Sequence, residues 1–530
     1  MHGDVAAQVV NGAGKIHPSE RIHFYRESAA VYGLLGLFSA LLALIVFNHE
    51  MYLDEAQAWL IARDSRSLFE LFHHLHYEAH PALWYLLLYL PAHFSSNMAW
   101  VQCINYALSV VMAWLILSEH RLPVVIRALL VFGLAIFFTM GVLARSYMLA
   151  GVLLVAAARC LLSDPRRHWL AVAFLALAIN THFFAIPIVA TIFVWLYCLA
   201  PHPGWSLISE RLREPRFWIS VAVLAGSMIV CYLSIRPAAD IYLPQYQVPG
   251  ASPLEYLILG IGKVWRYFLP FDLQQASRSS GELAAHVSLQ SVIDAGVTLG
   301  LWLLALAVLP GRRSRWFMIM SSVLWMAVVS LTVHIPLQTH STVLSVSYAI
   351  ALMIDAGNER KRSWIPSYAS QPVLLMLLSI QVSLCIFYCV LEWQKPFSGA
   401  KATATWLKSS GLGLRALVIE PQIVAPAILG YTGVQSAYFP GCQCRGSILV
   451  YRKGWDSNQQ ISLDELQALN RESGSSPIVI SNWRLRDESV RLLGLRLRYV
   501  SPLGFAWDNE NLFVYSYENP PEVKHFEINQ

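Results

Sequence analysis

The sequence predicts an α-helical polytopic membrane protein that ends in a small α/β domain. Of its 530 residues, 56% are hydrophobic and only 13% are charged, a composition too apolar for a soluble enzyme of this size. The apolar residues also gather into long stretches, and about 20 such residues are needed for a helix to cross a bilayer. We therefore expect membrane lipids around the chain and no nucleic-acid partner.

Eleven apolar segments are candidate transmembrane helices. Residues 1–27 are polar and lack the apolar run and cleavage site of a signal peptide, so we expect a cytoplasmic N-terminal segment followed by an uncleaved anchor. The predicted spans are residues 28–47, 99–118, 124–142, 146–163, 168–181, 183–199, 217–235, 288–309, 315–333, 341–356 and 371–391.

The basic residues predict the orientation of these spans. Every second loop carries an excess of arginine, which is typical of cytoplasmic loops. These residues are Arg121 and Arg127, Arg166 and Arg167, Arg211, Arg213 and Arg216, Arg312, Arg313 and Arg315, and Arg360, Lys361 and Arg362. Reading 168–199 as one span would break the alternation, so we keep two. A transmembrane domain of residues 28–391 with outer loops 48–98 and 236–287 follows.

The outer loops contain apolar stretches too short to cross a membrane. The sequence "PALWYLLLYLPAHF" at 81–94 is about half a span long and has Pro at its start and near its end. It predicts a helix that lies at the outer interface, where Trp and Tyr are common. The stretch "PLEYLILGIGKVWRYFLPF" in the second outer loop has a similar composition and the same predicted position.

Residues 392–530 have the pattern of an extracytoplasmic α/β domain. The stretch "AKATATWLKSS" is helix-like, and "RALVIE" and "PIVIS" are strand-like. The stretch "SLDELQALNRES" opens with a helix-capping pattern formed by Ser462 and Glu465. Alternating helices and strands favour an α/β architecture.

Two adjacent acids, Asp54 and Glu55, follow the first predicted span on its outer side. A carboxylate placed beside a hydroxyl group can act as a general base. The structural alternative is that both acids occupy the first turn of a helix, where the helix dipole favours negative charge.

The combination of motifs resembles the polyprenyl-phosphate-sugar glycosyltransferases of the GT-C superfamily. The outward Asp-Glu pair and the His-Pro of "HYEAHPALWY" are similar to the protein mannosyltransferases and lipid A aminoarabinose transferases, as are "ARSYML" at 144–149 and "NTHFF" at 180–184. The resemblance covers most of the chain. It departs from the family at "HIPLQTHSTVLSVSY", where members often carry an "RY" element.

This resemblance implies a GT-C-like fold and transfer of a sugar, with inversion, from a polyprenyl-phosphate donor to an acceptor hydroxyl on a lipid, glycan or protein. It implies that Asp54 is the general base and that Glu55 orients it or binds the acceptor. The expected location is a plasma membrane such as the bacterial inner membrane. The alternative function class is a polytopic transporter or lipid flippase that performs no transfer chemistry.

Arg145 and Tyr147 lie at the outer end of a predicted span. An arginine can bind a phosphate with a forked pair of charge-assisted hydrogen bonds, so Arg145 is a candidate for the donor phosphate. It could instead extend to lipid headgroups. Tyr147 is a candidate substrate-binding residue that is equally typical of a membrane interface.

His80, His182 and Glu78 are further candidate substrate-binding residues, although a lone histidine is more often structural. In "FHHLHYEAH", His76 and His80 are four residues apart and could share a helical face, with Glu78 and Asp54 as oxygen donors. This spacing is a weak indication of a divalent metal site. Cys442 and Cys444 would close a very small ring if they formed a disulfide, so free thiols remain an alternative.

Overall fold

A computed structural model of the protein describes residues 18–241, 289–332, 338–356, 367–412 and 415–517, together with isolated residues between 252 and 261. Residues 79, 199–209, 211, 457–458, 475 and 506–510 within these ranges are not described. Most of the predicted outer loop 236–287, including its predicted interfacial stretch, lies outside the described residues, as does most of the N-terminal segment 1–27.

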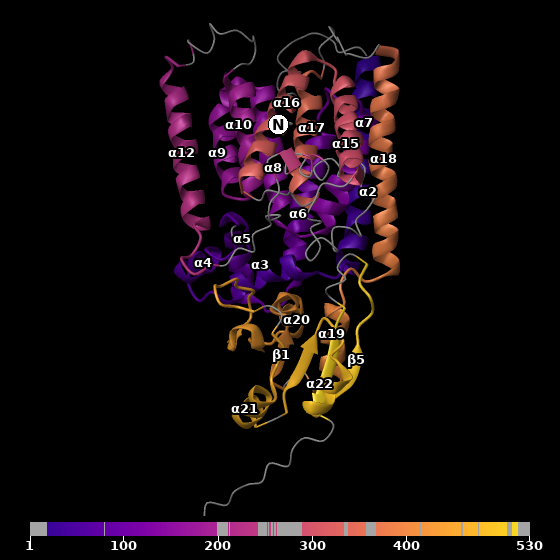
Figure 1. Ribbon diagram of the computed structural model, residues 1–530. Helices are drawn as coiled ribbons and strands as arrows, with labels where there is room; N and C mark the ends of the chain where they lie inside the picture. Colours follow the sequence, from indigo (N-terminus) through magenta and orange to yellow (C-terminus); the bar gives the residue numbers. More distant parts are fainter. Residues whose placement is uncertain are drawn as a thin grey trace, which may run out of the picture.

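Long helices run side by side and form a bundle, which occupies the upper part of Figure 1. Each of the eleven predicted spans contains one or more of its helices. The bundle consists of α2 (Pro18–Asn48), α6 (Ala99–Leu117), α7 (Val124–Val131) with the π-helix η1 (Ala135–Val142), α8 (Ser146–Ser163), α9 (His168–Ile179), α10 (Ile186–Ile192) with the π-helix η4 (Phe193–Cys198), α12 (Pro215–Ile235), α15 (Leu289–Ala307), α16 (Arg312–Thr332), α17 (Thr342–Ile354) and α18 (Ser367–Gln394). Short 3₁₀ turns at η2 (Pro165–Arg167), η3 (Phe183–Ala185) and η6 (Gln338–Ser341) connect some of them.

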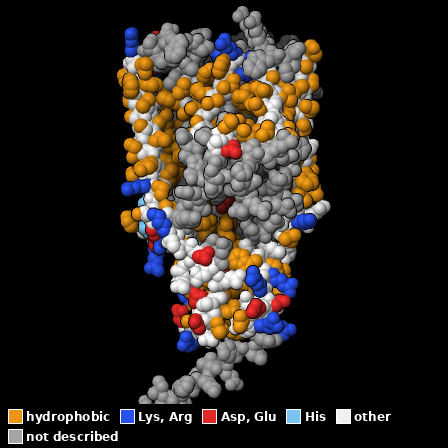
Figure 2. All heavy atoms as spheres, viewed as in Figure 1, with side chains coloured by type: hydrophobic (Ala, Val, Ile, Leu, Met, Phe, Trp, Pro, Cys, Tyr) orange, Lys and Arg blue, Asp and Glu red, His pale blue; other side chains and the backbone are white. Residues whose placement is uncertain are grey.

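The outside of this bundle is apolar. Figure 2 shows hydrophobic side chains over much of the described helical surface. On α2, α12 and α18, large side chains such as Leu44, Ile229 and Ile386 are more than half exposed. A continuous apolar surface of this extent is typical of contact with lipid. Within the described residues, six helices are long and apolar enough to cross a bilayer. The chain is a mostly helical membrane protein, while the predicted number of eleven spans stays a prediction.

Three short helices lie between the bundle and the C-terminal part of the chain (Figure 1): α3 (Leu53–Asp64), α4 (Leu68–Leu75) and α5 (Leu83–Phe94). The helix α5 matches the predicted interfacial stretch. The side chain of Ser67 accepts a hydrogen bond from Glu70 N and so caps the start of α4. Both α3 and α5 bury large aromatic residues, including Trp59 and Trp84, so they form a packed layer under the bundle.

The C-terminal region, residues 395–517, contains a six-stranded sheet with the strand order β3-β2-β1-β4-β6-β5. Strands β2, β1 and β4 are parallel, and β3, β6 and β5 pair antiparallel with their neighbours. The strands are β1 (Leu417–Glu420), β2 (Ala437–Phe439), β3 (Cys444–Gly446), β4 (Ile478–Ser481), β5 (Leu495–Val500) and β6 (Phe513–Tyr517). The helices are α19 (Ala400–Ser409), α20 (Ala425–Thr432), α21 (Leu463–Ser473) and α22 (Asp487–Leu492), with 3₁₀ turns η8 (Gln422–Val424) and η9 (Pro440–Cys442).

The two faces of this sheet join different cores. Side chains of successive strand residues point to opposite faces. On β1, Leu417 and Ile419 belong to the large core that continues into the helical bundle. Val418 belongs to a smaller cluster with Leu466 of α21 and Tyr515 of β6. The sheet is therefore packed firmly against the helical part, and its other face is covered by α21.

Candidate active site

Asp54 and Glu55 begin α3 and point in different directions, since adjacent residues on a helix are about 100° apart. The Glu55 side chain is fully buried. The Asp54 side chain remains 33% exposed. Only Asp54 is therefore open to a substrate.

Glu55 is the centre of a buried network. One of its oxygens, Oε1, accepts a hydrogen bond from Ala144 N at 2.6 Å. The other, Oε2, accepts from Tyr52 N at 3.2 Å and lies 3.0 Å from His49 Nε2. The predicted role of Glu55 in binding the acceptor stays a prediction that these contacts do not favour. They are the contacts of a helix cap and a structural carboxylate.

His49 extends this network to the last helix of the bundle. Its Nδ1 lies 3.0 Å from Glu392 Oε1, near the end of α18, so the imidazole is held between two carboxylates. Burial by itself lowers the pKa of His49, but the two carboxylates outweigh this effect and raise the pKa from 6.5 to about 10. We call His49, Glu55 and Glu392 the buried triad. It carries a protonated imidazole at neutral pH.

Asp54 is held by an arginine and a tyrosine. Its Oδ2 lies 2.9 Å from Arg145 Nη1 and accepts a hydrogen bond from Tyr52 Oη at 3.1 Å. Arg145 precedes α8 and also lies 5.2 Å from the centre of the Tyr147 ring. The arginine side chain is 12% exposed. The structure thus brings together Asp54, Arg145 and Tyr147, which the sequence indicated only as separate candidates; their roles in binding and catalysis stay predictions.

Two histidines, His80 and His182, lie next to Arg145 and Tyr147. The His182 ring is 4.2 Å from the Tyr147 ring and 5.8 Å from the His80 ring, measured between centroids. Burial is the main cause that lowers the pKa of each, and the positive charge of Arg145 contributes; the pKa of His80 falls to about 4. Both imidazoles are therefore neutral at pH 7.

His340, which precedes α17, is a third member of this group. Its ring is 4.5 Å from Phe184, which in turn contacts His182. Burial and Arg145 lower the pKa of His340 to about 3. The described part of the site therefore combines one cation, Arg145, with neutral imidazoles.

Glu78 lies next to His80 and is held by two donors. It accepts hydrogen bonds from Gln57 Nε2 and Tyr85 Oη, each at 3.1 Å. Burial is the main reason that its pKa rises to about 7. The Glu78 carboxylate lies 3.7 Å from His80 Nδ1. It therefore borders the same group of residues as Asp54.

Gln57 connects this group to the C-terminal region. Its Oε1 accepts a hydrogen bond from Leu449 N, and its Nε2 donates to Leu449 O, both at 2.9 Å. Leu449 belongs to a segment, residues 447–453, that we call the strap. The strap also bonds through Ser447 to Asp64 at the end of α3.

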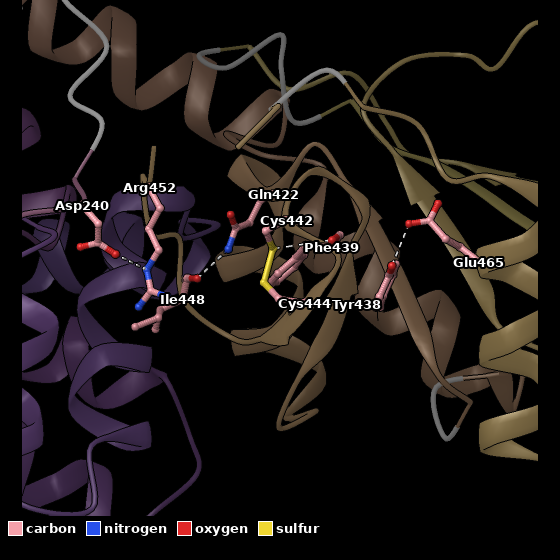
Figure 3. The surroundings of a disulfide bond; sticks show 9 residues. All are labelled: Asp240, Gln422, Tyr438, Phe439, Cys442, Cys444, Ile448, Arg452 and Glu465. Atoms are coloured by element: carbon pink, nitrogen blue, oxygen red, sulfur yellow. Dashed lines mark hydrogen bonds and ion pairs between the residues drawn. A yellow bond between two sulfur atoms is a disulfide. The ribbon is translucent and has the colours of Figure 1, made fainter. Parts of the chain in front are cut away.

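Figure 3 shows other contacts of the strap. Arg452 pairs with Asp240, which follows α12, at 3.5 Å, and Ile448 O accepts from Gln422 Nε2 at 2.9 Å. Just before the strap, Cys442 and Cys444 form a disulfide bond. The sequence alone did not decide between this disulfide and two free thiols, because the bond closes a very small ring. The strap fixes the C-terminal region against α3 and the chain after α12.

The predicted metal pair does not form on a helix. The helix α4 ends at Leu75, so His76 and His80 do not share a helical face. His76 Nε2 lies 3.3 Å from Leu233 O, and His80 Nδ1 lies 2.9 Å from Glu78 O. Among the described residues, no group of three or more His, Cys, Asp or Glu side chains is arranged to hold a metal ion.

Comparison with protein-family models and with curated protein sequences gives no match. Among solved structures, the chain is similar to a single-particle cryo-EM structure of the arabinofuranosyltransferase AftD from mycobacteria, with a TM-score of 0.35 and 16% sequence identity. The likeness covers 92% of this chain, which spans 41% of that protein.

Sequence reasoning missed several residues of the site. Tyr52, which bonds Asp54, directly precedes the predicted helix start and could have been noticed by its position. His49 and Glu392 are 343 residues apart, and a single polar residue at a span end gives no signal of its partner. In the part of the chain that the structure describes, the Gln57 side chain bonds the backbone of the strap and the Glu78 carboxylate, and no sequence motif indicates such contacts.

The buried triad generates a stability prediction. Replacing His49→Gln leaves two buried carboxylates without their cation, so we expect a loss of about 3–5 kcal/mol and a clearly lower midpoint of thermal unfolding in detergent. His93→Gln, at an exposed position on α5, is the matched control and should unfold as the wild type does. Equal unfolding midpoints for both variants would refute a stabilising triad.

The same network predicts a pH dependence. Because the pKa of His49 is raised from 6.5 to about 10, its contribution to stability is fully present below pH 6.5 and is lost as the pH rises through 10. The difference in unfolding temperature between wild type and His49→Gln should therefore shrink as the pH rises from 7 to 10.5. A constant difference over that range would contradict the assignment of a charged imidazole.

Proposed function

We propose that the protein is a glycosyltransferase that moves a sugar from a polyprenyl-phosphate donor to an acceptor hydroxyl at the outer face of the membrane, with inversion at the anomeric carbon. The observation that carries this proposal is the partly exposed Asp54 carboxylate, held at 2.9 Å from Arg145. The pair joins a proton acceptor and a phosphate-binding group next to an apolar bundle.

The chemistry of such a transfer needs both groups. The donor is already activated, because its phosphate is a good leaving group. Asp54 accepts the proton of the acceptor hydroxyl as the oxygen attacks the anomeric carbon, and the bond from that carbon to the phosphate oxygen breaks. Both partners of Asp54 in the contacts described above bind Oδ2, so those contacts leave Oδ1 available to accept the proton.

Arg145 suits the leaving phosphate. A guanidinium has five N–H donors, and the contacts with Asp54 and Tyr52 use only Nη1. Its remaining donors can bind the two free oxygens of a phosphodiester in a forked arrangement. Glu78 and His80 lie 3.7 Å apart, and we assign them to the acceptor side. Tyr147, whose ring packs against Arg145, is assigned to the donor side.

The charge distribution supports an outward-facing site. The starts of α6 and α8 lie near His49 and Asp54, and the opposite ends of these helices are followed by Arg121 and by Arg166 and Arg167. Since cytoplasmic loops are enriched in such residues, the opposite end, with Asp54 and the C-terminal region, faces outward. A polyprenyl phosphate carried in the outer leaflet would then reach the site from the side of the bundle.

The orientation predicts the accessibility of single reporter cysteines in a Cys103→Ser background. A membrane-impermeant maleimide added to intact cells should label Ser410→Cys, directly after α19, whereas His120→Cys should react only after permeabilisation. Both positions are exposed in the structure, so burial does not explain a difference. Labelling of His120→Cys in intact cells would reverse the orientation.

Asp54→Asn tests the general base. The amide keeps the size of the side chain but cannot accept the proton, so turnover of a panel of polyprenyl-phosphate sugars by the purified protein should fall roughly a hundredfold or more. Asp164→Asn, which caps η2 at the other end of the bundle, should have no such effect. Near-normal turnover by Asp54→Asn would leave only the helix-cap role. If wild-type protein in vesicles moves these lipids without consuming them, it is a flippase.

Arg145→Lys tests the phosphate contact. A lysine keeps the charge but loses the fork, so we expect donor affinity to fall about ten- to a hundredfold, equivalent to about 1.5–3 kcal/mol. Arg63→Lys is the control, because Arg63 forms a forked pair with Asp64 away from the site. Binding of a polyprenyl phosphate, measured by calorimetry in detergent, should be unchanged in the control. Unchanged binding in Arg145→Lys would assign this arginine to lipid headgroups.

A further inference from the structure

His182 has a proton whose position the structure defines. Its Nδ1 accepts a hydrogen bond from Phe184 N at 3.1 Å and so caps the turn η3. A nitrogen that accepts a hydrogen bond carries no proton, and a neutral imidazole has one N–H. The proton of His182 is therefore on Nε2. A second proton on Nδ1 would face the Phe184 N–H, which keeps the ring neutral.

The Nε2–H group of His182 is buried and has no hydrogen-bond partner in the part of the chain that the structure describes. Only 2% of the residue is exposed. Leaving a buried donor unpaired costs free energy, so such groups are rare and each needs an explanation. The local fold uses only Nδ1, and it would be satisfied by a smaller cap such as Asn.

The position of the ring indicates what Nε2 serves. His182 stacks 4.2 Å from Tyr147, and Arg145 lies 5.2 Å from the centre of that same Tyr147 ring. His182 comes from the junction of α9 and η3, whereas Arg145 precedes α8. Two separate junctions thus place a neutral N–H donor and the guanidinium of the site against the same Tyr147 ring.

We infer that His182 Nε2–H donates a hydrogen bond to an oxygen of the donor phosphate, as a second phosphate ligand beside Arg145. This inference rests on the proposed function. A neutral donor suits this position, since it binds a phosphate oxygen and adds no charge next to Arg145. It also keeps its proton throughout the reaction, so it holds the phosphate both before and after the bond to the sugar breaks.

Two substitutions separate this role from the structural cap. His182→Asn places an oxygen near the position of Nδ1, so it keeps the bond from Phe184 N and removes the Nε2 donor. His182→Gln extends an amide N–H toward the position of Nε2 and loses the cap. A merely structural histidine would tolerate Asn better than Gln, and a phosphate ligand would show the opposite order in binding.

The probe is farnesyl phosphate, which carries the lipid phosphate without any sugar, with farnesol as the control for apolar binding. For the full-length protein in detergent, we expect His182→Asn to unfold at the wild-type temperature and to bind farnesyl phosphate about tenfold more weakly. His182→Gln should unfold at a lower temperature and bind within about threefold of wild type. His120→Asn, at an exposed position, is the matched control, and farnesol binding should be the same in all four proteins.

The outcomes distinguish this inference from the proposed function. If wild type binds farnesyl phosphate and His182→Asn binds it equally well, the phosphate contact is wrong; a loss of transfer in that variant would then assign Nε2 to a sugar hydroxyl. If wild type binds farnesyl phosphate no better than farnesol, the proposed function itself fails. If His182→Asn loses farnesyl phosphate and farnesol together, the residue is structural and the inference is overturned.

Discussion

The protonated imidazole of His49 holds together the parts of the chain from which the site is built. It lies after the first bundle helix, α2, and contacts Glu392 near the end of the last bundle helix, α18, and Glu55 in the first turn of α3. Glu55 in turn accepts from Ala144 N, next to Arg145. A buried charge of this kind is stable only when its partners are complete. The positions of Asp54 and Arg145 therefore depend on a contact that neither residue makes.

This arrangement explains why two neighbouring acids have different surroundings. Glu55 is surrounded by donors and a cation, and its carboxylate fixes the start of α3. Asp54, one residue earlier, keeps a third of its side chain exposed. A rigid buried network directly beside an accessible carboxylate is a suitable basis for chemistry, since the reacting group is held in position without being covered.

Much of the helical architecture was predictable, because a span needs about 20 apolar residues and this requirement is local. The strands β1 and β4 were predictable for a similar reason, since they are continuous apolar runs. The short strands β2 and β3 gave no such signal, with three residues each. Asp54, Arg145 and His182 were found by their position at span ends. Their assembly was not, because it depends on Glu392 and on Leu449, which are hundreds of residues away.

The strap has a consequence for how the sequence of this protein can vary. Leu449 bonds Gln57 through its backbone N–H and C=O, and its side chain packs against the large core, so another apolar residue at position 449 would keep this contact. The number of residues between Cys444 and Leu449 is not free, because one insertion would move the two backbone groups away from Gln57. Related chains that keep a glutamine at the position of Gln57 should therefore agree in the length of this segment even where the residue at position 449 differs.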